Sequence, residues 1–145
     1  MFFQLALVAT IVVSAADARP PLTDRKFHVI VNRANPVSSL TRSELSAMFM
    51  KRTRSWPDRG EIVPVDQTAR SSVRGEFSRA IHLKSVAYVV RYWQRLIFSG
   101  RGIPPRELVS DAAVIELVSA NRTAIGYVDR DTPLGDDVKA ITVTK

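Results

Sequence analysis

Short apolar runs rich in β-branched residues alternate along the chain with segments whose apolar positions recur every three or four residues. The runs over 27–31, 62–66, 124–128 and 138–144 predict strands, and helical spacing predicts helices over 41–50, 71–82, 85–98 and 111–120. The first run, F-H-V-I-V, is apolar without a break, as in a parallel-sheet strand buried on both faces. Gly126, within the run A-I-G-Y-V, indicates tight packing or a bulge. This order of strands and helices predicts one α/β domain.

The helix expected after residue 41 begins with a capping box, T-R-S-E. Thr41 would cap the amide of Glu44, and the Glu44 side chain would reach back to the start of the helix. The same carboxylate lies near the positive end of the helix dipole and neutralises it. This helix therefore offers no site for an anion.

The helix expected from residue 71 begins differently. Ser71 and Ser72 stand between Arg70 and Arg74, and the first acidic residue after them is Glu76. Hydroxyls, unpaired N–H groups and arginines together are what a phosphate or sulfate needs. The pattern predicts an oxyanion site. The alternative is that Ser71 is an ordinary N-cap whose neighbouring arginines point into water.

Asp66 ends the strand that leads into this helix, and ligands of open α/β sheets bind beyond the carboxyl ends of strands. Asp66 could accept a proton from a protonated phosphate oxygen. Equally, it could be an Asx-type turn residue. Asp111 is expected to be the N-cap of the helix over 111–120. Trp56, in the basic loop over 51–61, is expected to cover an edge of the core rather than stack on a ligand.

The helix over 85–98, capped by Ser85, is apolar around almost its whole circumference. Such a helix is normally central in a fold, or it uses its second face for a partner. Its apolar positions are Val86, Tyr88, Val89, Val90, Tyr92, Trp93, Leu96, Ile97 and Phe98.

Composition narrows the range of functions. The chain of 145 residues is long enough for one domain, and without cysteine it has no disulfide and no thiolate metal site. The two histidines, His28 and His82, lack ligand spacing, so no metal or other cofactor is expected. His82 is interpreted as a polar residue at a helix C-terminus that interacts favourably with the helix dipole. No G-x-S-x-G motif occurs, and His82 lies about three helical turns from Ser71, so no catalytic residue is expected.

The formal net charge of +7 is spread along the chain and is not gathered in a dense stripe. A basic exported protein can meet nucleic acid, an anionic membrane surface or small anions. Because nucleic-acid binding usually shows a denser basic stripe, it is not expected here.

The first sixteen residues are almost wholly apolar but too short to span a membrane comfortably, and A-D-A follows at 16–18. This pattern predicts a signal peptide over 1–18 and a single mature domain over 19–145. We therefore expect export to the periplasm, with no membrane span after cleavage.

Four segments together resemble the substrate-binding proteins of phosphate ABC transporters. They are V-I-V-N-R-A-N-P-V-S-S-L-T-R-S-E-L-S-A-M-F, S-W-P-D-R-G-E-I-V-P-V, R-S-S-V-R-G-E-F and A-I-G-Y-V. The chain is especially similar to short, single-domain members that carry Y-W-Q-R-L-I-F-S-G-R-G-I-P-P. The resemblance implies a three-layer mixed sheet flanked by helices, forming a single lobe of the type II periplasmic binding-protein fold. It also implies that Ser71 and Arg74 contact phosphate, with Ser72 standing where the family has Gly and Val73 where it has Thr.

The expected function is therefore an exported protein, not an enzyme, that binds phosphate or a similar oxyanion through Asp66, Arg70, Ser71, Ser72 and Arg74. A family receptor closes two lobes on its ligand, so a membrane transporter or a second copy of the chain could complete the site. The alternative is a periplasmic protein-interaction adaptor that has lost tight ligand binding and uses the surface over 88–98.

Overall fold

The computed structural model describes residues 25–145; the predicted signal peptide over 1–18 and the first residues of the predicted mature domain lie outside this range. A six-stranded mixed sheet has the strand order β2-β8-β1-β7-β5-β6. Its strands are β1 (Phe27–Asn32), β2 (Ser39–Thr41), β5 (Val63–Gln67), β6 (Arg106–Leu108), β7 (Ala124–Asp129) and β8 (Val138–Thr144). Strands β3 (Ser55–Trp56) and β4 (Gly60–Glu61) form a separate small hairpin.

The helices are α1 (Arg42–Phe49), α2 (Ser72–Phe77), α3 (Val86–Phe98) and α4 (Asp111–Ala120). Helix α2 continues directly into a π-helical segment, η2 (Ser78–His82), which ends where Leu83 adopts the left-handed conformation. The predicted helix over 71–82 therefore has the expected extent but changes its hydrogen-bonding pattern halfway. The capping box at Thr41 and Glu44 is confirmed, with both reciprocal hydrogen bonds present.

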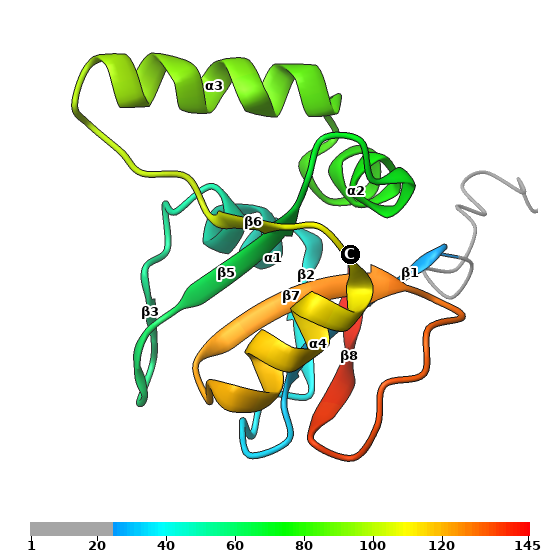
Figure 1. Ribbon diagram of the computed structural model, residues 1–145. Coiled ribbons are helices and arrows are strands. Elements are labelled where there is room, and N and C mark those ends of the chain that lie inside the picture. Colours follow the sequence, from blue (N-terminus) through cyan, green and yellow to red (C-terminus); the bar gives the residue numbers. More distant parts are fainter. Residues whose placement is uncertain (1–24) are drawn as a thin grey trace, which may run out of the picture.

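Strand β1 runs antiparallel to both of its neighbours, β7 and β8, whereas β5 runs parallel to β7 and β6. The expectation of a parallel setting for β1 is therefore wrong. The strand is nevertheless buried on both faces, because helices cover both sides of the sheet (Figure 1). An unbroken apolar run indicates that both faces of a strand are covered, but it does not indicate whether the strand is parallel or antiparallel to its neighbours.

Helices α1 and α2 lie on one face of the sheet and α4 on the other (Figure 1). On the first face, the rings of Phe77 and Tyr127 stack with centroids 3.9 Å apart. On the second, Val114 packs so closely that a Cβ on Gly126 would meet its Cγ1 at 2.7 Å. The prediction of tight packing at Gly126 is confirmed. Trp56 is buried, and its indole N–H donates to Thr123 O at 2.9 Å, as expected of a residue that closes an edge of the core.

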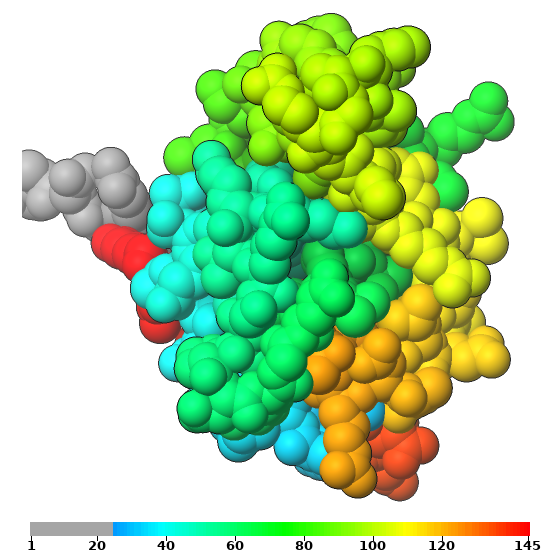
Figure 2. Space-filling view, turned by 90° about the vertical axis from the view of Figure 1, so that its left-hand side faces the viewer, coloured from blue at the N-terminus to red at the C-terminus, as the bar shows by residue number. Residues whose placement is uncertain are grey.

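Helix α3 forms one end of the molecule (Figures 1 and 2). It buries only Val89 and Trp93, which pack with Met50 in a small separate cluster. The expectation of a central helix is therefore wrong, because the turn after η2 directs the chain away from the sheet before the loop after α3 returns to β6. The other alternative, that the second apolar face of this helix is left uncovered and available to a partner, remains. No helix between residues 25 and 145 is long and apolar enough to cross a membrane.

Candidate functional site

The end of β5 and the start of α2 form a short, tightly bonded loop. The backbone N–H of Ser71 donates to Thr68 O at 2.9 Å and closes the turn. The Ser71 hydroxyl accepts from the N–H of Arg74 at 3.4 Å, as an N-cap does, and donates to Gln67 Oε1 at 2.8 Å. The predicted helix start is confirmed, and Ser71 is the N-cap of this helix.

An open hollow of about 400 Å³ lies in front of this loop. Ser72 and Val73 line it, and they carry first-turn N–H groups, which have no acceptor within the helix. Arg70 lies at its rim with an exposed side chain. The full lining is Gln67, Thr68, Arg70, Ser71, Ser72, Val73, Val109, Asp111 and Asp129. Three of the five predicted site residues, Arg70, Ser71 and Ser72, therefore meet at one place.

Arg74 and Asp66, the other two, lie beneath the loop and not in the hollow. Arg74 is 3% exposed, and its guanidinium lies 3.4 Å from the Asp66 carboxylate and 2.5 Å from that of Glu107. The same guanidinium donates to Gln67 O at 2.7 Å. Asp66 also accepts hydrogen bonds from the hydroxyl of Tyr127 and from the N–H of Gln67. The two residues are brought together, but they pair with each other.

Burial dominates the electrostatics of this network. It raises the pKa of the Asp66 carboxyl, and the charge of Arg74 and the Tyr127 hydrogen bond offset only part of that rise. Burial alone would lower the pKa of Arg74, but the carboxylates of Asp66 and Glu107 outweigh it and the pKa is raised. Burial together with the Asp66 charge also raises the pKa of the Tyr127 hydroxyl. The network therefore holds Arg74 charged and Tyr127 protonated.

Two residues that sequence reasoning did not assign to the site, Gln67 and Asp111, connect the loop to α4. The Gln67 amide donates to Asp111 Oδ1 at 2.7 Å and to Tyr127 O at 3.0 Å. Asp111 also accepts from the N–H of Asp129 at 3.0 Å and from the hydroxyl of Thr132 at 2.6 Å. The expectation that Asp111 caps α4 is wrong.

Ser110 is the N-cap of α4, and its hydroxyl accepts from Ala113 N–H at 3.1 Å, so the Asp111 carboxylate is free for these longer-range bonds. Asp111 and Asp129 also line the hollow. An anion in the hollow would therefore be repelled by these two carboxylates and attracted by Arg70.

His82 also differs from expectation. Burial, with a further contribution from the charges of Arg52, Arg74 and Arg42, lowers its pKa to about 4. Its Nδ1 lies 2.9 Å from the hydroxyl of Ser46. His82 is the last residue of η2, so its expected place at a helix C-terminus is confirmed. It is neutral at pH 7, however, and the expected favourable interaction with the helix dipole is wrong. Among residues 25–145, no group of three or more His, Cys, Asp or Glu side chains could hold a metal ion.

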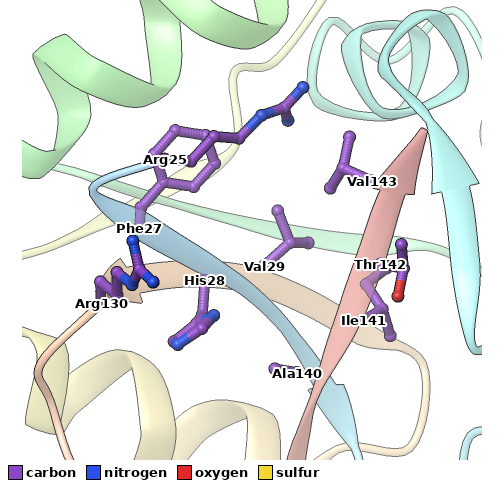
Figure 3. Close-up of a pocket in the computed structure, with 9 residues that line it drawn as sticks. All are labelled: Arg25, Phe27, His28, Val29, Arg130, Ala140, Ile141, Thr142 and Val143. Carbon is purple, nitrogen blue, oxygen red and sulfur yellow. The ribbon is translucent and has the colours of Figure 1, made fainter. Parts of the chain in front are cut away.

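A second hollow, of about 380 Å³, lies between β1 and β8 (Figure 3). The ladder between these strands stops at Val29 and Ile141, although both strands continue beyond it. Arg25 and Arg130 line this hollow, but Figure 3 shows Arg25 on one side of β1 and Arg130 on the other, with His28. Its cations therefore do not converge on one point, and the hollow before α2 is the better candidate for an anion.

Comparison with known proteins found no matching family model and no matching curated protein. Solved structures do match. An ABC-type phosphate transport receptor from Vibrio cholerae superposes with a TM-score of 0.64 at 23% identity, covering 81% of this chain and 46% of the receptor. A putative phosphate ABC transporter substrate-binding protein from Clostridium perfringens, with bound phosphate, gives 0.62 at 22% identity, over 81% of this chain and 44% of that one.

A possible phosphate-binding protein from Planctomyces limnophilus gives a TM-score of 0.60 at 16% identity, over 83% of this chain and 42% of that one. The chain thus spans less than half the length of each of these proteins. The predicted fold class, a mixed sheet flanked by helices that forms a single lobe, is confirmed. The chain has the α/β fold of one lobe of phosphate-transport receptors.

Proposed function

We propose that the protein is an exported, periplasmic phosphate- or oxyanion-binding protein and that the hollow before α2 is its site. The observation that carries this proposal is that Arg70, Ser72 and Val73, the last two in the first turn of α2, line one hollow. No acidic residue lies in the first turn of α2 to occupy these donors. The fold of a receptor with bound phosphate supports the same function.

The five proposed site residues divide into two groups. Arg70, Ser71 and Ser72 are the contacting group, because they line the hollow. Arg74 and Asp66 are the positioning group, because they hold Gln67 and the loop from below. Neither has to move for an anion to enter. The protein has no catalytic role in this proposal.

The hollow is open to solvent, and charge interactions weaken where water remains. A partner that covers the hollow would raise the affinity. A membrane transporter and a second copy of this chain are the candidates for such a partner. Without such a cover we expect binding that is saturable but modest.

The test is calorimetric titration of inorganic phosphate, then sulfate, into the purified protein. Arg70→Ala and Ser72→Ala are each expected to weaken binding by at least about tenfold, since a hydrogen bond to a charged group contributes about 1.5–3 kcal/mol. Arg79→Ala is the matched control, because Arg79 is an exposed arginine of the same helical segment that does not line the hollow. It should leave the affinity within about twofold.

Two results would count against the proposal. One is the absence of any phosphate heat from protein that is shown to be folded by its thermal unfolding. The other is an equal loss of affinity in Arg79→Ala and Arg70→Ala, which would indicate a general effect of net charge.

The second candidate function is the periplasmic adaptor, and the exposed apolar side chains of α3 favour it. It predicts no oxyanion binding and a specific protein partner. A pull-down in which variants of α3 and the wild type recover the same proteins would argue against it.

A further inference from the structure

The segment between Glu76 and Glu107 carries charge of only one sign. Its thirty residues include no Asp or Glu and six basic side chains: Arg79, Lys84, Arg91, Arg95, Arg101 and Arg106. Elsewhere in the mature chain, acidic and basic residues are interspersed. The same segment contains α3 and the loops on both sides of it.

Exposed apolar side chains concentrate in this basic segment. Of the six large apolar residues that are exposed within 25–145, all but Val109 belong to it. Phe98 is 90% exposed, Ile103 77%, Leu83 63% and Ile97 51%, and Tyr88 is also exposed. Burying this many apolar side chains on a partner is favourable, and contiguous exposed apolar surface marks an interaction site.

The helix presents this surface outward. Val89 and Trp93 face Met50, and at 100° per residue the opposite side carries Arg91 and Phe98, with Ile97 on the flank. Beyond the helix end, Ile97 and Ile103 line one shallow apolar hollow with Gly100, Gly102 and Pro104, so the apolar surface continues into the loop. Figures 1 and 2 show α3 at an end of the molecule, where a flat surface can approach it.

The charge decides the class of partner. Two copies of this surface would bring twelve basic groups together without an acidic one, so self-association through it is unfavourable. The partner must be anionic. The exposed apolar side chains lie at both ends of α3 and in the loop that follows it, and they do not form the regularly spaced ridge that a protein groove requires. A bilayer interface accepts such side chains without a matching shape, and basic residues around them add attraction to anionic lipid.

We propose that α3 and the loop over 99–103 dock the protein on an anionic phospholipid surface. Ile97, Phe98 and Ile103 enter the headgroup region, while Arg91, Arg95 and Arg101 contact lipid phosphates. The helix lies in the plane of the interface and does not cross it. This docking is independent of oxyanion binding in the hollow before α2, since the two surfaces share no residue.

The absence of cysteine from the chain allows a site-specific test. Ser99→Cys in the full chain is labelled with the environment-sensitive fluorophore NBD and mixed with phosphatidylcholine vesicles, with or without about 30% phosphatidylglycerol. We expect a blue shift and a rise in emission with the anionic vesicles only, suppressed by high salt. Asp136→Cys, labelled in the exposed loop before β8, is the control and should not change. Because the label reports its own position, apolar residues near the N-terminus cannot produce the signal at Ser99.

Two double variants complete the test by vesicle co-sedimentation. Ile97→Ser/Phe98→Ser and Arg91→Gln/Arg95→Gln should each weaken binding to anionic vesicles by about tenfold or more. Arg33→Gln/Arg122→Gln removes the same charge from exposed positions elsewhere and should change binding by less than about threefold. Unchanged phosphate titration and thermal unfolding show that the α3 variants remain intact.

Absence of a lipid-dependent change at Ser99, or equal loss in the α3 and control arginine variants, would overturn the proposal. If the labelled protein instead shows the same change with an acidic protein and none with anionic vesicles, the surface recognises a protein and the membrane assignment is wrong.

Discussion

Arg74→Met tests how the loop before α2 is held in place. The substitution keeps much of the length of the side chain and removes its charge. It removes the three contacts that the guanidinium makes with Asp66, Gln67 O and Glu107, at a site where the side chain is only 4% exposed. Asp66 is then left in the interior without its counter-charge.

The expected loss of stability is large. Breaking a buried ion pair by removing one partner costs about 3–5 kcal/mol. A domain of this size has a free energy of unfolding of about 5–15 kcal/mol, so the loss is a substantial part of the total.

The loss should also depend on pH. Because burial raises the folded-state pKa of Asp66 above its unfolded value, the folded protein holds this proton more tightly than the unfolded chain does. The stability that this gives is fully present below the unfolded pKa and is lost as pH rises through the folded one. Without Arg74 the folded pKa rises further, so the variant should lose more stability at pH 7 than near pH 4.

Urea unfolding, followed by the fluorescence of Trp56 and Trp93, measures this at both pH values. The double variant Asp66→Asn/Arg74→Met removes both charges and should recover most of the loss at pH 7, since the penalty comes from the unpaired carboxylate. A single variant within about 1 kcal/mol of the wild type would refute the reasoning. So would a double variant no more stable than the single one.

The same pair of variants decides the role of Arg74 in binding. Loss of phosphate binding by Arg74→Met alone is ambiguous, because the loop itself is expected to lose its support. If the stable double variant still binds phosphate, Arg74 is a positioning residue. If it does not bind although its stability is restored, Arg74 takes a direct part.

Three further perturbations test other parts of the fold. The pKa of His82 is about 4 in the folded protein against 6.5 in the unfolded chain, so the protein should lose up to about 3 kcal/mol of stability as pH falls from about 6.5 to 4. His82→Asn should remove this dependence of stability on pH, measured by urea unfolding, and the same dependence in both proteins would contradict the prediction. Gly126→Ala should destabilise by about 1–3 kcal/mol through its clash with Val114, whereas Gly75→Ala, whose Cβ would have room, should be neutral or stabilising; equal midpoints would refute the packing argument. Asp111→Ala leaves three donors without their acceptor and should cost about 1–3 kcal/mol, against little change for exposed Asp131→Ala in the same assay.

Features written in a few neighbouring residues could be predicted from the sequence. The capping box at Thr41 and the N-cap at Ser85 form bonds that span three residues, and both appear as expected. The N-cap at Ser71, which the sequence analysis gives as the alternative to an oxyanion site, is also present. The strands β5 and β7 were predicted to within a residue at their ends, because their apolar runs end abruptly. Direction within the sheet was not predictable in this way, since β1 pairs with strands about a hundred residues away.

The sequence does contain a signal for the orientation of Arg74. At helical spacing it stands three residues before Phe77 and seven before Ile81, both of which are buried, so it belongs to the covered face. An arginine on an apolar face needs a carboxylate partner, and Asp66 ends the adjacent strand. The sequence gives no such signal for Glu107, because β6 is only three residues long and pairs with β5 although α3 separates the two strands in the sequence.

The division between a buried network and an open hollow would allow a single lobe to present the proposed anion site. A two-lobed receptor can order its donors as it closes on the ligand, but one lobe has to hold them in place beforehand. Here two hydrogen bonds hold the loop in place: the Arg74 guanidinium donates to Gln67 O, and the Gln67 side-chain amide donates to Asp111. Gln67 in turn accepts from the hydroxyl of Ser71, the N-cap of α2. Arg74 therefore fixes the geometry of the loop, and in the proposed function the N–H and hydroxyl donors of the loop would bind the anion without reorganisation.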